Sequence, residues 1–173
     1  MTSFQTWLPH QASNSSDDLL AEISQVEELS PVLTFLRKLP VNVSEASSSV
    51  IAKIKELQPK AIICCGMAES RTKLTVESCA TCGEALIKTS VNLDKLVDKL
   101  AGCEISYDAG KFVCEGLYYE VLKYLQERND NTCCIFVHVP LLTPDNSPNI
   151  VADFRLIIQR VNRRMKLSVI PFN

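Results

Sequence analysis

Around the stretch from Ser106 to Leu122, SYDAGKFVCEGLYYEVL, the sequence changes from a strand-like pattern to a helical one within a few residues. A short apolar run, Cys103 to Ser106, enters a turn at residues 107–110. From Lys111 onward, apolar residues recur every three or four positions, which is typical of an amphipathic helix. These residues are Val113, Leu117, Val121 and Tyr124. The order strand, turn, helix restricts the chain to folds in which a strand ends beside the start of a helix.

Cys114 lies in the first turns of this predicted helix. Ser106 or Asp108 is expected to cap the helix by accepting hydrogen bonds from its first amides. The helix dipole and the free N–H groups at this end favour the thiolate, which is the reactive form of cysteine. Cys114 is therefore a candidate nucleophile.

A nucleophilic cysteine needs a base that takes its proton and a third group that orients the base. The chain has two histidines. His10 lies in a polar stretch that reads as a loop, whereas His138 lies at the end of an apolar run that Pro140 terminates. Active sites of open α/β sheets gather at the carboxyl ends of the strands, which favours His138. Spacing alone also allows a core cysteine and a histidine that is merely satisfied by hydrogen bonds.

Strand-like and helical patterns alternate along the rest of the chain. Further strands are predicted at residues 2–4, 32–36, 61–66, 74–80 and 103–106, and further helices at 17–29, 44–57, 93–100 and 150–165. This alternation favours an α/β sandwich, with a mostly parallel sheet between helices on both faces. The length of 173 residues suits one domain over residues 1–173.

Composition restricts the class of protein further. The net charge of −2, without a long basic run, gives no support for nucleic-acid binding. No apolar run approaches the roughly 20 residues that cross a bilayer, and the N-terminus lacks the pattern of a signal peptide. An intracellular protein without a membrane partner is expected. The eight cysteines are then read mostly as reduced, buried apolar residues.

Three further features allow more than one reading. Glu77 lies inside an apolar strand pattern, so it either faces outward or pairs with a buried group such as His138. Cys79 and Cys82 form a CxxC pair, which zinc sites and redox sites also use. Aromatic side chains near the first strand, Phe4 and Trp7, either pack in the core or form an apolar wall for a small ring.

Five motifs occur in the order found in one known family: TSFQTW, CGMAESR, LTVESCA, SYDAGKFVCEGLYY and FVHVPLL. From Thr2 through the last predicted helix, the sequence resembles the pyroglutamyl peptidase I family, also called pyrrolidone-carboxylate peptidases. The resemblance implies a three-layer α/β/α sandwich of the phosphorylase/hydrolase-like type, with a mostly parallel mixed sheet. It also implies a cytoplasmic cysteine peptidase that needs no metal or cofactor and removes N-terminal pyroglutamate from peptides.

The resemblance carries residue roles with it. By position, Cys114 resembles the nucleophile, His138 the general base and Glu77 the carboxylate that orients the base. The residues expected to bind substrate are Phe4 and Trp7, as walls of the ring pocket, and Ala68 and Arg71, in a turn whose backbone lies beside the active site.

The sequence also departs from the family pattern. The interval between Glu77 and Cys114 is shorter than in typical members, and the missing segment helps to shape the pocket and the subunit contacts. The resemblance allows a homo-oligomer, although part of the segment that makes the family's subunit contacts is missing. Trp7 replaces a phenylalanine and should narrow the pocket, and Glu115 replaces an asparagine. The family's first strand begins before the position of Met1, so this strand is expected to be truncated.

Two other functions stay open at this point. The first is a degenerate member of the family that binds a ligand or partner without turnover. The second is a metal or redox module built on Cys79 and Cys82.

Overall fold

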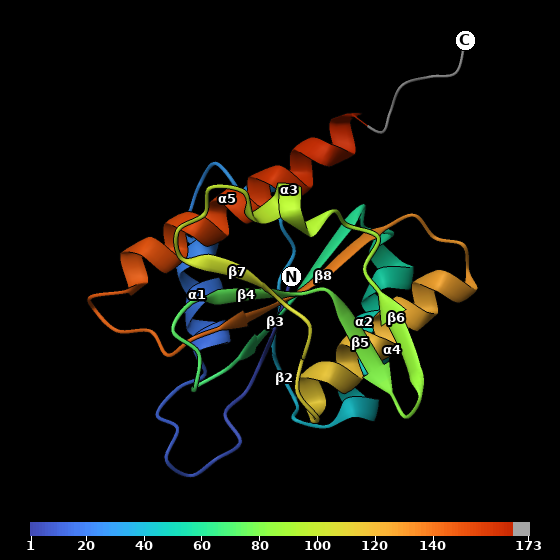
Figure 1. Cartoon of the computed structure of the whole chain (residues 1–173), viewed down its shortest axis with the longest axis horizontal. Helices are drawn as coiled ribbons and strands as arrows, with labels where there is room; N and C mark the ends of the chain where they lie inside the picture. Colours follow the sequence, from blue (N-terminus) through green and yellow to red (C-terminus); the bar gives the residue numbers. More distant parts are fainter. Residues whose placement is uncertain (168–173) are drawn as a thin grey trace.

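The computed structural model describes residues 1–167. Within them a six-stranded sheet lies between two layers of helices (Figure 1). Across the sheet the strands are β2 (Leu36–Leu39), β1 (Thr2–Phe4), β3 (Ala61–Met67), β8 (Cys133–Val139), β4 (Leu74–Glu77) and β7 (Cys103–Ser106). The helices are α1 (Ser15–Ser24), α2 (Val43–Leu57), α3 (Leu93–Val97), α4 (Val113–Glu127) and α5 (Ser147–Leu167).

The sheet is mixed but mostly parallel, as the sequence predicts. The four strands β2, β1, β3 and β8 run parallel to one another. β4 then pairs antiparallel with β8, and β7 pairs parallel with β4. Helices α1, α3 and α5 cover one face of the sheet and α2 and α4 cover the other, so the predicted three layers are confirmed (Figure 1).

Successive residues of the central strands point to opposite faces and build two separate cores. In β3, Ile63 packs toward α1 and α5, whereas Ile62 and Cys64 pack toward α2 and α4. In β8, Phe136 belongs to the same core as Cys64. His138 follows Phe136 by two residues and therefore points to the face that α4 covers.

The structure corrects two predicted strands. Residues 32–36 were expected to form a strand, but Ser30–Val32 form a 3₁₀ turn and β2 begins only at Leu36. The reason is the partner strand: the Leu36 amide donates to the Met1 carbonyl at 2.9 Å, so pairing starts where the chain offers a neighbour. The run at residues 74–80 breaks at Ser78, where the chain leaves the sheet.

After this break the chain forms a separate hairpin, β5 (Cys79–Cys82) and β6 (Ala85–Lys88), which the sequence interpretation missed. The hairpin lies beside α4 (Figure 1). Its two-residue turn begins at Gly83, whose φ of 60° suits glycine at the first turn position. The signal was therefore present as a glycine between two short apolar runs.

The helix bounds agree with the periodicity except at their ends. The helix predicted at residues 17–29 begins at Ser15, because Asn14 caps it by accepting from the Ser16 amide at 3.1 Å. It ends at Ser24. Within residues 1–167, none of the helices combines the length and the apolar character that crossing a membrane requires.

An ion pair between the buried Asp17 and the more exposed Arg37 joins α1 to β2, and Ser3 links it to β1. Arg37 donates from Nε and Nη2 to the two carboxylate oxygens of Asp17, each at 2.8 Å. The Ser3 hydroxyl donates to Asp17 Oδ1 at 2.7 Å and accepts from the Lys38 amide at 3.2 Å. Burial opposes ionisation of Asp17, but the hydrogen bonds and the charge of Arg37 outweigh it, so the pKa of Asp17 lies below its ordinary value.

We predict that Asp17→Asn lowers the free energy of unfolding by about 1 kcal/mol at pH 7, because the buried side chain at position 17 loses its charge-assisted hydrogen bonds from Arg37. Urea titration measures this loss. The matched control is Glu56→Gln, which removes an exposed ion pair with Lys53 and should cost about 0.5 kcal/mol or less.

The difference between wild type and Asp17→Asn should depend on pH. The folded-state pKa of Asp17 is lowered, so its stabilisation is present above the unfolded value near 4 and is lost as the pH falls through the folded value. The difference between the two proteins in free energy of unfolding should therefore be smaller at pH 3 than at pH 7. A difference that is equal at both pH values would contradict an ionic contribution from Asp17.

Candidate active site

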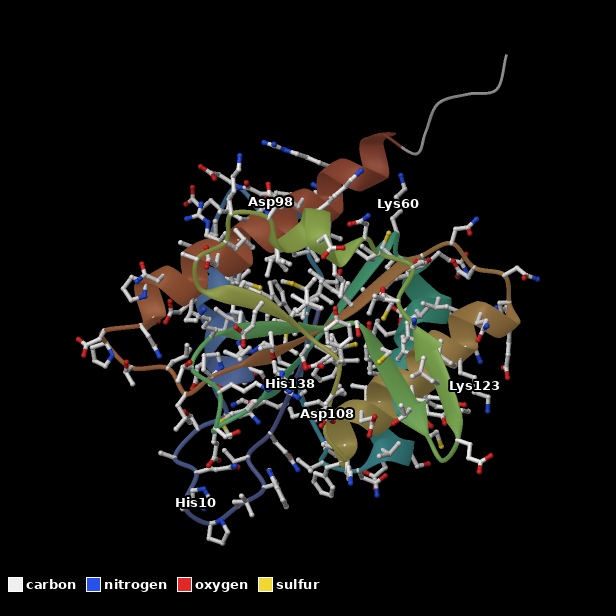
Figure 2. All side chains as sticks on the ribbon, in the orientation of Figure 1. His10, Lys60, Asp98, Asp108, Lys123 and His138 are labelled. Atoms are coloured by element: carbon white, nitrogen blue, oxygen red, sulfur yellow. The ribbon has the colours of Figure 1, made fainter. Side chains whose placement is uncertain are left out.

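Residues from the end of β8, the start of α4 and the loop before α4 line one pocket. His138 lies near the carboxyl end of β8, and Cys114 is the second residue of α4. Both line a pocket of about 270 Å³, together with the loop residues Ala109 and Gly110 that precede α4. Figure 2 shows His138 inside the body of the molecule and His10 on an outer loop. The structure thus brings the expected cysteine and base to one cavity.

Glu77 contacts His138 directly. Its Oε1 atom lies 2.7 Å from His138 Nδ1, and both side chains are buried. The antiparallel pairing of β4 with β8 explains this contact, because it sets Thr75 opposite His138 and Glu77 opposite Phe136 on the face that α4 covers. Glu77 therefore does not face outward, which was the alternative reading of its position in the strand.

The buried Glu77 carboxylate stays ionised because of its neighbours. Burial would raise its pKa, but hydrogen bonds from His138 and Ser106, the charge of His138 and the hydrogen bond from Arg71 bring the pKa below the ordinary value. The Tyr118 hydroxyl donates to the Glu77 carbonyl at 3.1 Å and so fixes the backbone from the side of α4. Among the described residues, Glu77 Oε2 has no hydrogen-bond partner.

Arg71 reaches this carboxylate from the loop between β3 and β4. Its Nη1 atom donates to Glu77 Oε1 at 2.6 Å and also to the Thr75 hydroxyl. Arg71 was expected beside the substrate, but its side chain lies outside the set that lines the pocket, as does Ala68. The Ala68 amide donates to the Val139 carbonyl at 2.9 Å, and the Arg71 amide donates to the Ala68 carbonyl at 3.0 Å. These two amides are thus already engaged within the fold.

The Cys114 thiol is held against the sheet. A Cβ atom placed on Gly66 of β3 would lie 2.6 Å from Cys114 Sγ, so only glycine leaves room for the sulfur there. Burial raises the pKa of Cys114 to about 12, and the nearby Glu77 charge adds to the rise, while Arg71 opposes it. Burial thus opposes the thiolate that the helix start is expected to favour.

The start of α4 also differs from the prediction. The helix begins after Phe112, which provides no side-chain cap. Ser106 and Asp108 instead bond within the preceding loop, where Asp108 Oδ1 accepts from the Gly110 amide at 2.9 Å. The first backbone bond of the helix runs from Gly116 N to the Phe112 carbonyl, so the three amides before Gly116 are left as open donors next to Cys114.

Aromatic side chains form one wall of the pocket. Phe4 is buried at its base, and Trp7 stacks on Phe112 with ring centroids 4.7 Å apart. Trp7 and Phe112 are each 52% exposed, so this pair lies at the pocket mouth. Phe112 was not singled out from the sequence as a site residue. Its position two residues before the candidate nucleophile was the available signal.

Two polar residues, Gln11 and Glu69, also line the pocket. Glu69 accepts from Gln11 Nε2 at 2.6 Å and lies 3.2 Å from His10 Nε2. Gln11 in turn accepts from the Trp7 amide at 3.0 Å. His10 thus contacts Glu69 and not Glu77.

The CxxC pair does not resemble a metal site. Cys79 is buried in β5, whereas Cys82, three residues further, is exposed. An odd spacing along a strand directs two side chains to opposite faces. In the part of the chain that the structure describes, no three His, Cys, Asp or Glu side chains group as metal ligands.

Known proteins resemble this chain in sequence and in fold. No family model matches it. A pyrrolidone-carboxylate peptidase of Vibrio parahaemolyticus is 30% identical over 159 residues, which cover 72% of this chain and 74% of the relative. A pyrrolidone-carboxylate peptidase of Bacillus cereus is 24% identical over 159 residues, covering 77% and 74%.

Two solved structures share the fold. The pyrrolidone carboxyl peptidase from Thermococcus litoralis superposes with a TM-score of 0.80 at 17% identity, covering 99% of this chain and 97% of that one. The pyroglutamyl peptidase I from Bacillus amyloliquefaciens gives a TM-score of 0.76 at 18% identity, with 90% of each chain covered.

An α/β/α sandwich whose pocket holds a cysteine and a carboxylate-bound histidine defines a class of hydrolytic enzymes that use a thiol. Within that class, the sequence similarity is decisive, because a relative 30% identical is matched over about three quarters of its length. This chain belongs to the pyrrolidone-carboxylate peptidase family.

We predict that Gly66→Ala slows the reaction of Cys114 with iodoacetamide about 100-fold, because the new methyl group displaces Sγ and a shift near 1 Å has effects of that size. Peptide mapping by mass spectrometry measures labelling at Cys114. The matched control is Gly102→Ala, where the added Cβ would instead lie 2.9 Å from Asp153 Oδ2. Labelling of Gly66→Ala at the wild-type rate would contradict the placement of the sulfur against β3.

Proposed function

We propose that this chain is a cysteine peptidase that removes pyroglutamate from the N-terminus of peptides. The observation that carries the proposal is the buried contact between Glu77 and His138 at the pocket that also contains Cys114. Cys114 is the nucleophile, His138 is the general base and Glu77 orients the base. The printed names of the related proteins support the same reaction.

The contact between Glu77 and His138 supports a proton path from Cys114 to His138. Glu77 engages His138 Nδ1, which leaves Nε2 to accept the proton of Cys114. The pKa of Cys114 near 12 makes this transfer necessary at neutral pH, because little thiolate forms without it. The buried Glu77 charge then stabilises the imidazolium that results.

The chemical steps follow from these roles. The sulfur bonds to the carbonyl carbon of the pyroglutamyl residue while its proton moves to His138. The carbon–nitrogen bond then breaks, and His138 returns the proton to the leaving amine. Water attacks the resulting thioester with His138 as base, which releases pyroglutamate and restores the thiol.

Open amides at the start of α4 suit the oxyanion. They are adjacent to Cys114 and have no intrahelical partner, and the positive end of the helix dipole lies there. The Ala68 and Arg71 amides are engaged elsewhere, so we assign the oxyanion to α4.

The pocket suits a small, uncharged ring. Pyroglutamate lacks the positive charge of an ordinary N-terminus, and Phe4, Trp7 and Phe112 offer apolar faces for it. The acidic Glu69 at the rim is already paired with Gln11 and His10. We further propose action in the cytoplasm, where the free thiols of this chain would stay reduced.

The first test measures hydrolysis of a fluorogenic pyroglutamyl amide. Wild type should cleave it, and Cys114→Ala should show no turnover, because the nucleophile is absent. Glu77→Gln should lower kcat roughly 100-fold or more, since it removes the charge that stabilises the imidazolium. The control variant is Cys82→Ala, which changes an exposed thiol and should keep wild-type turnover.

A prolyl amide serves as the control substrate and should not be cleaved. Turnover that persists in Cys114→Ala would overturn the assignment of the nucleophile. No turnover by folded wild-type protein would favour a family member that binds a ligand without hydrolysing it.

A second test follows the thiol directly. In His138→Ala, alkylation of Cys114 should be slow at pH 7 and should rise steadily up to at least pH 10, because the raised pKa leaves the thiol protonated. In wild type, alkylation should already be fast near neutral pH. Equal rates for both proteins at pH 7 would show that His138 does not take the proton.

A further inference from the structure

Arg71 connects two parts of the candidate site that lie far apart in the sequence. Its Nη1 atom donates to Glu77 Oε1 at 2.6 Å. Its Nη2 atom donates to the carbonyl of Asp108 at 2.8 Å. Asp108 lies directly before Ala109 and Gly110, which line the pocket. One guanidinium group thus spans from the buried carboxylate to the pocket wall.

We propose that Arg71 is a positioning residue that holds Glu77 against His138 and, at the same time, fixes the pocket wall at residues 108–110. The proposal rests on the proposed function, which gives Glu77 and His138 their roles. It assigns to Arg71 a task different from the substrate contact implied by the family resemblance.

The hydrogen bonds of the carboxylate show why a second donor is needed. Oε1 of Glu77 accepts from both His138 and Arg71, whereas Oε2 has no partner in the described part of the chain. Without Arg71, Oε1 would keep only the bond to His138. Two donors on one oxygen fix its position toward the imidazole.

The pocket wall also depends on this arginine. Within the loop ahead of α4, Asp108 Oδ1 accepts from the Gly110 amide and the Asp108 amide donates to Ser106 Oγ at 3.2 Å. The bond to Gly110 is internal to the loop, whereas the bond to Ser106 joins the loop to the last residue of β7. The bond from Arg71 adds a second connection, from the loop to the β3–β4 segment.

The charge of Arg71 acts on the same cluster. The titratable groups that face the Glu77 side chain or backbone are His138 from β8, Cys114 and Tyr118 from α4, and Arg71 itself. The Arg71 contact helps to lower the pKa of Glu77 and opposes the rise in the pKa of Cys114. A positive charge at position 71 thus makes the whole cluster less ready to take up a proton.

Two variants separate the effect of the Arg71 charge from the effect of its two simultaneous hydrogen bonds. Arg71→Met removes the charge and every donor at nearly the same length. Arg71→Lys keeps the charge, but one ammonium group cannot reach both acceptors in the planar arrangement of a guanidinium. The readouts are kcat and KM on the pyroglutamyl amide and the pH dependence of Cys114 alkylation.

The acid limb is the low-pH part of a profile, where the rate rises as the site loses a proton. For Arg71→Met, we expect the acid limbs of kcat/KM and of Cys114 alkylation to move to higher pH by about one unit. The reason is that loss of a nearby positive charge makes the cluster bind protons more readily. We expect KM to rise about fivefold, which corresponds to one hydrogen bond of the pocket wall. For Arg71→Lys, the acid limb should stay in place while KM rises by a similar factor.

The matched control is Arg37→Met, which removes the guanidinium bound to Asp17 and leaves Glu77 untouched. It should lower stability without moving the acid limb. An acid limb of Arg71→Met that coincides with that of wild type would overturn the proposal, because a merely structural arginine would behave like Arg37. If Arg71→Met does not fold, the test uses Arg71→Lys. A KM equal to that of wild type, or an acid limb shifted from that of wild type, would then overturn the proposal.

Failure of this inference and failure of the proposed function are distinguishable. Alkylation of Cys114 does not require peptide hydrolysis, so its acid limb tests Arg71 even if wild type cleaves no pyroglutamyl amide. Conversely, normal turnover with an unmoved limb in Arg71→Met would leave the peptidase intact and reject only the role of Arg71.

Discussion

The carboxylate of Glu77 is fully buried, and most of the site follows from that single constraint. An ionised carboxylate taken out of water costs several kcal/mol unless donors replace the solvent. Here the donors are His138 and Arg71 on one oxygen. The same contacts that make the burial tolerable also orient the imidazole and join the carboxylate to the loop before α4. Stability of the fold and preparation of the site thus depend on the same hydrogen bonds.

Sheet topology determines which residues meet this carboxylate. β4 is the one strand of the described sheet that runs against its neighbour β8, and this reversal sets Thr75 across from His138. A parallel β4 would carry Glu77 out at the same edge as the other strand ends, away from its present register with Phe136. α4 then covers this face and holds Cys114 over Gly66. The family relationship fits this arrangement, because the related structures share the fold over nearly the whole chain.

Part of the site was predictable from sequence for simple reasons. A helix periodicity that starts just before Cys114, and an apolar run that ends at His138, each place a side chain at an element end, where pockets form. The predictions failed where non-local partners decide. The strand expected at residues 32–36 is instead Leu36–Leu39, because pairing with β1 begins with Thr2 opposite Leu36. The cap expected from Ser106 or Asp108 failed because both side chains bond inside their own loop.

The sequence by itself determined the alternation of strands and helices, the two-faced apolar pattern of the central strands, and the cysteine and histidine at the ends of their elements. These features are local, because they depend on side-chain periodicity and on the backbone limits of proline and glycine. Only the tertiary structure decided the antiparallel pairing of β4, the burial that raises the pKa of Cys114 and the two hydrogen bonds by which Arg71 links Glu77 to Asp108. Register, burial and charge environment arise from contacts between segments far apart in the chain, and a pattern within one segment does not encode them.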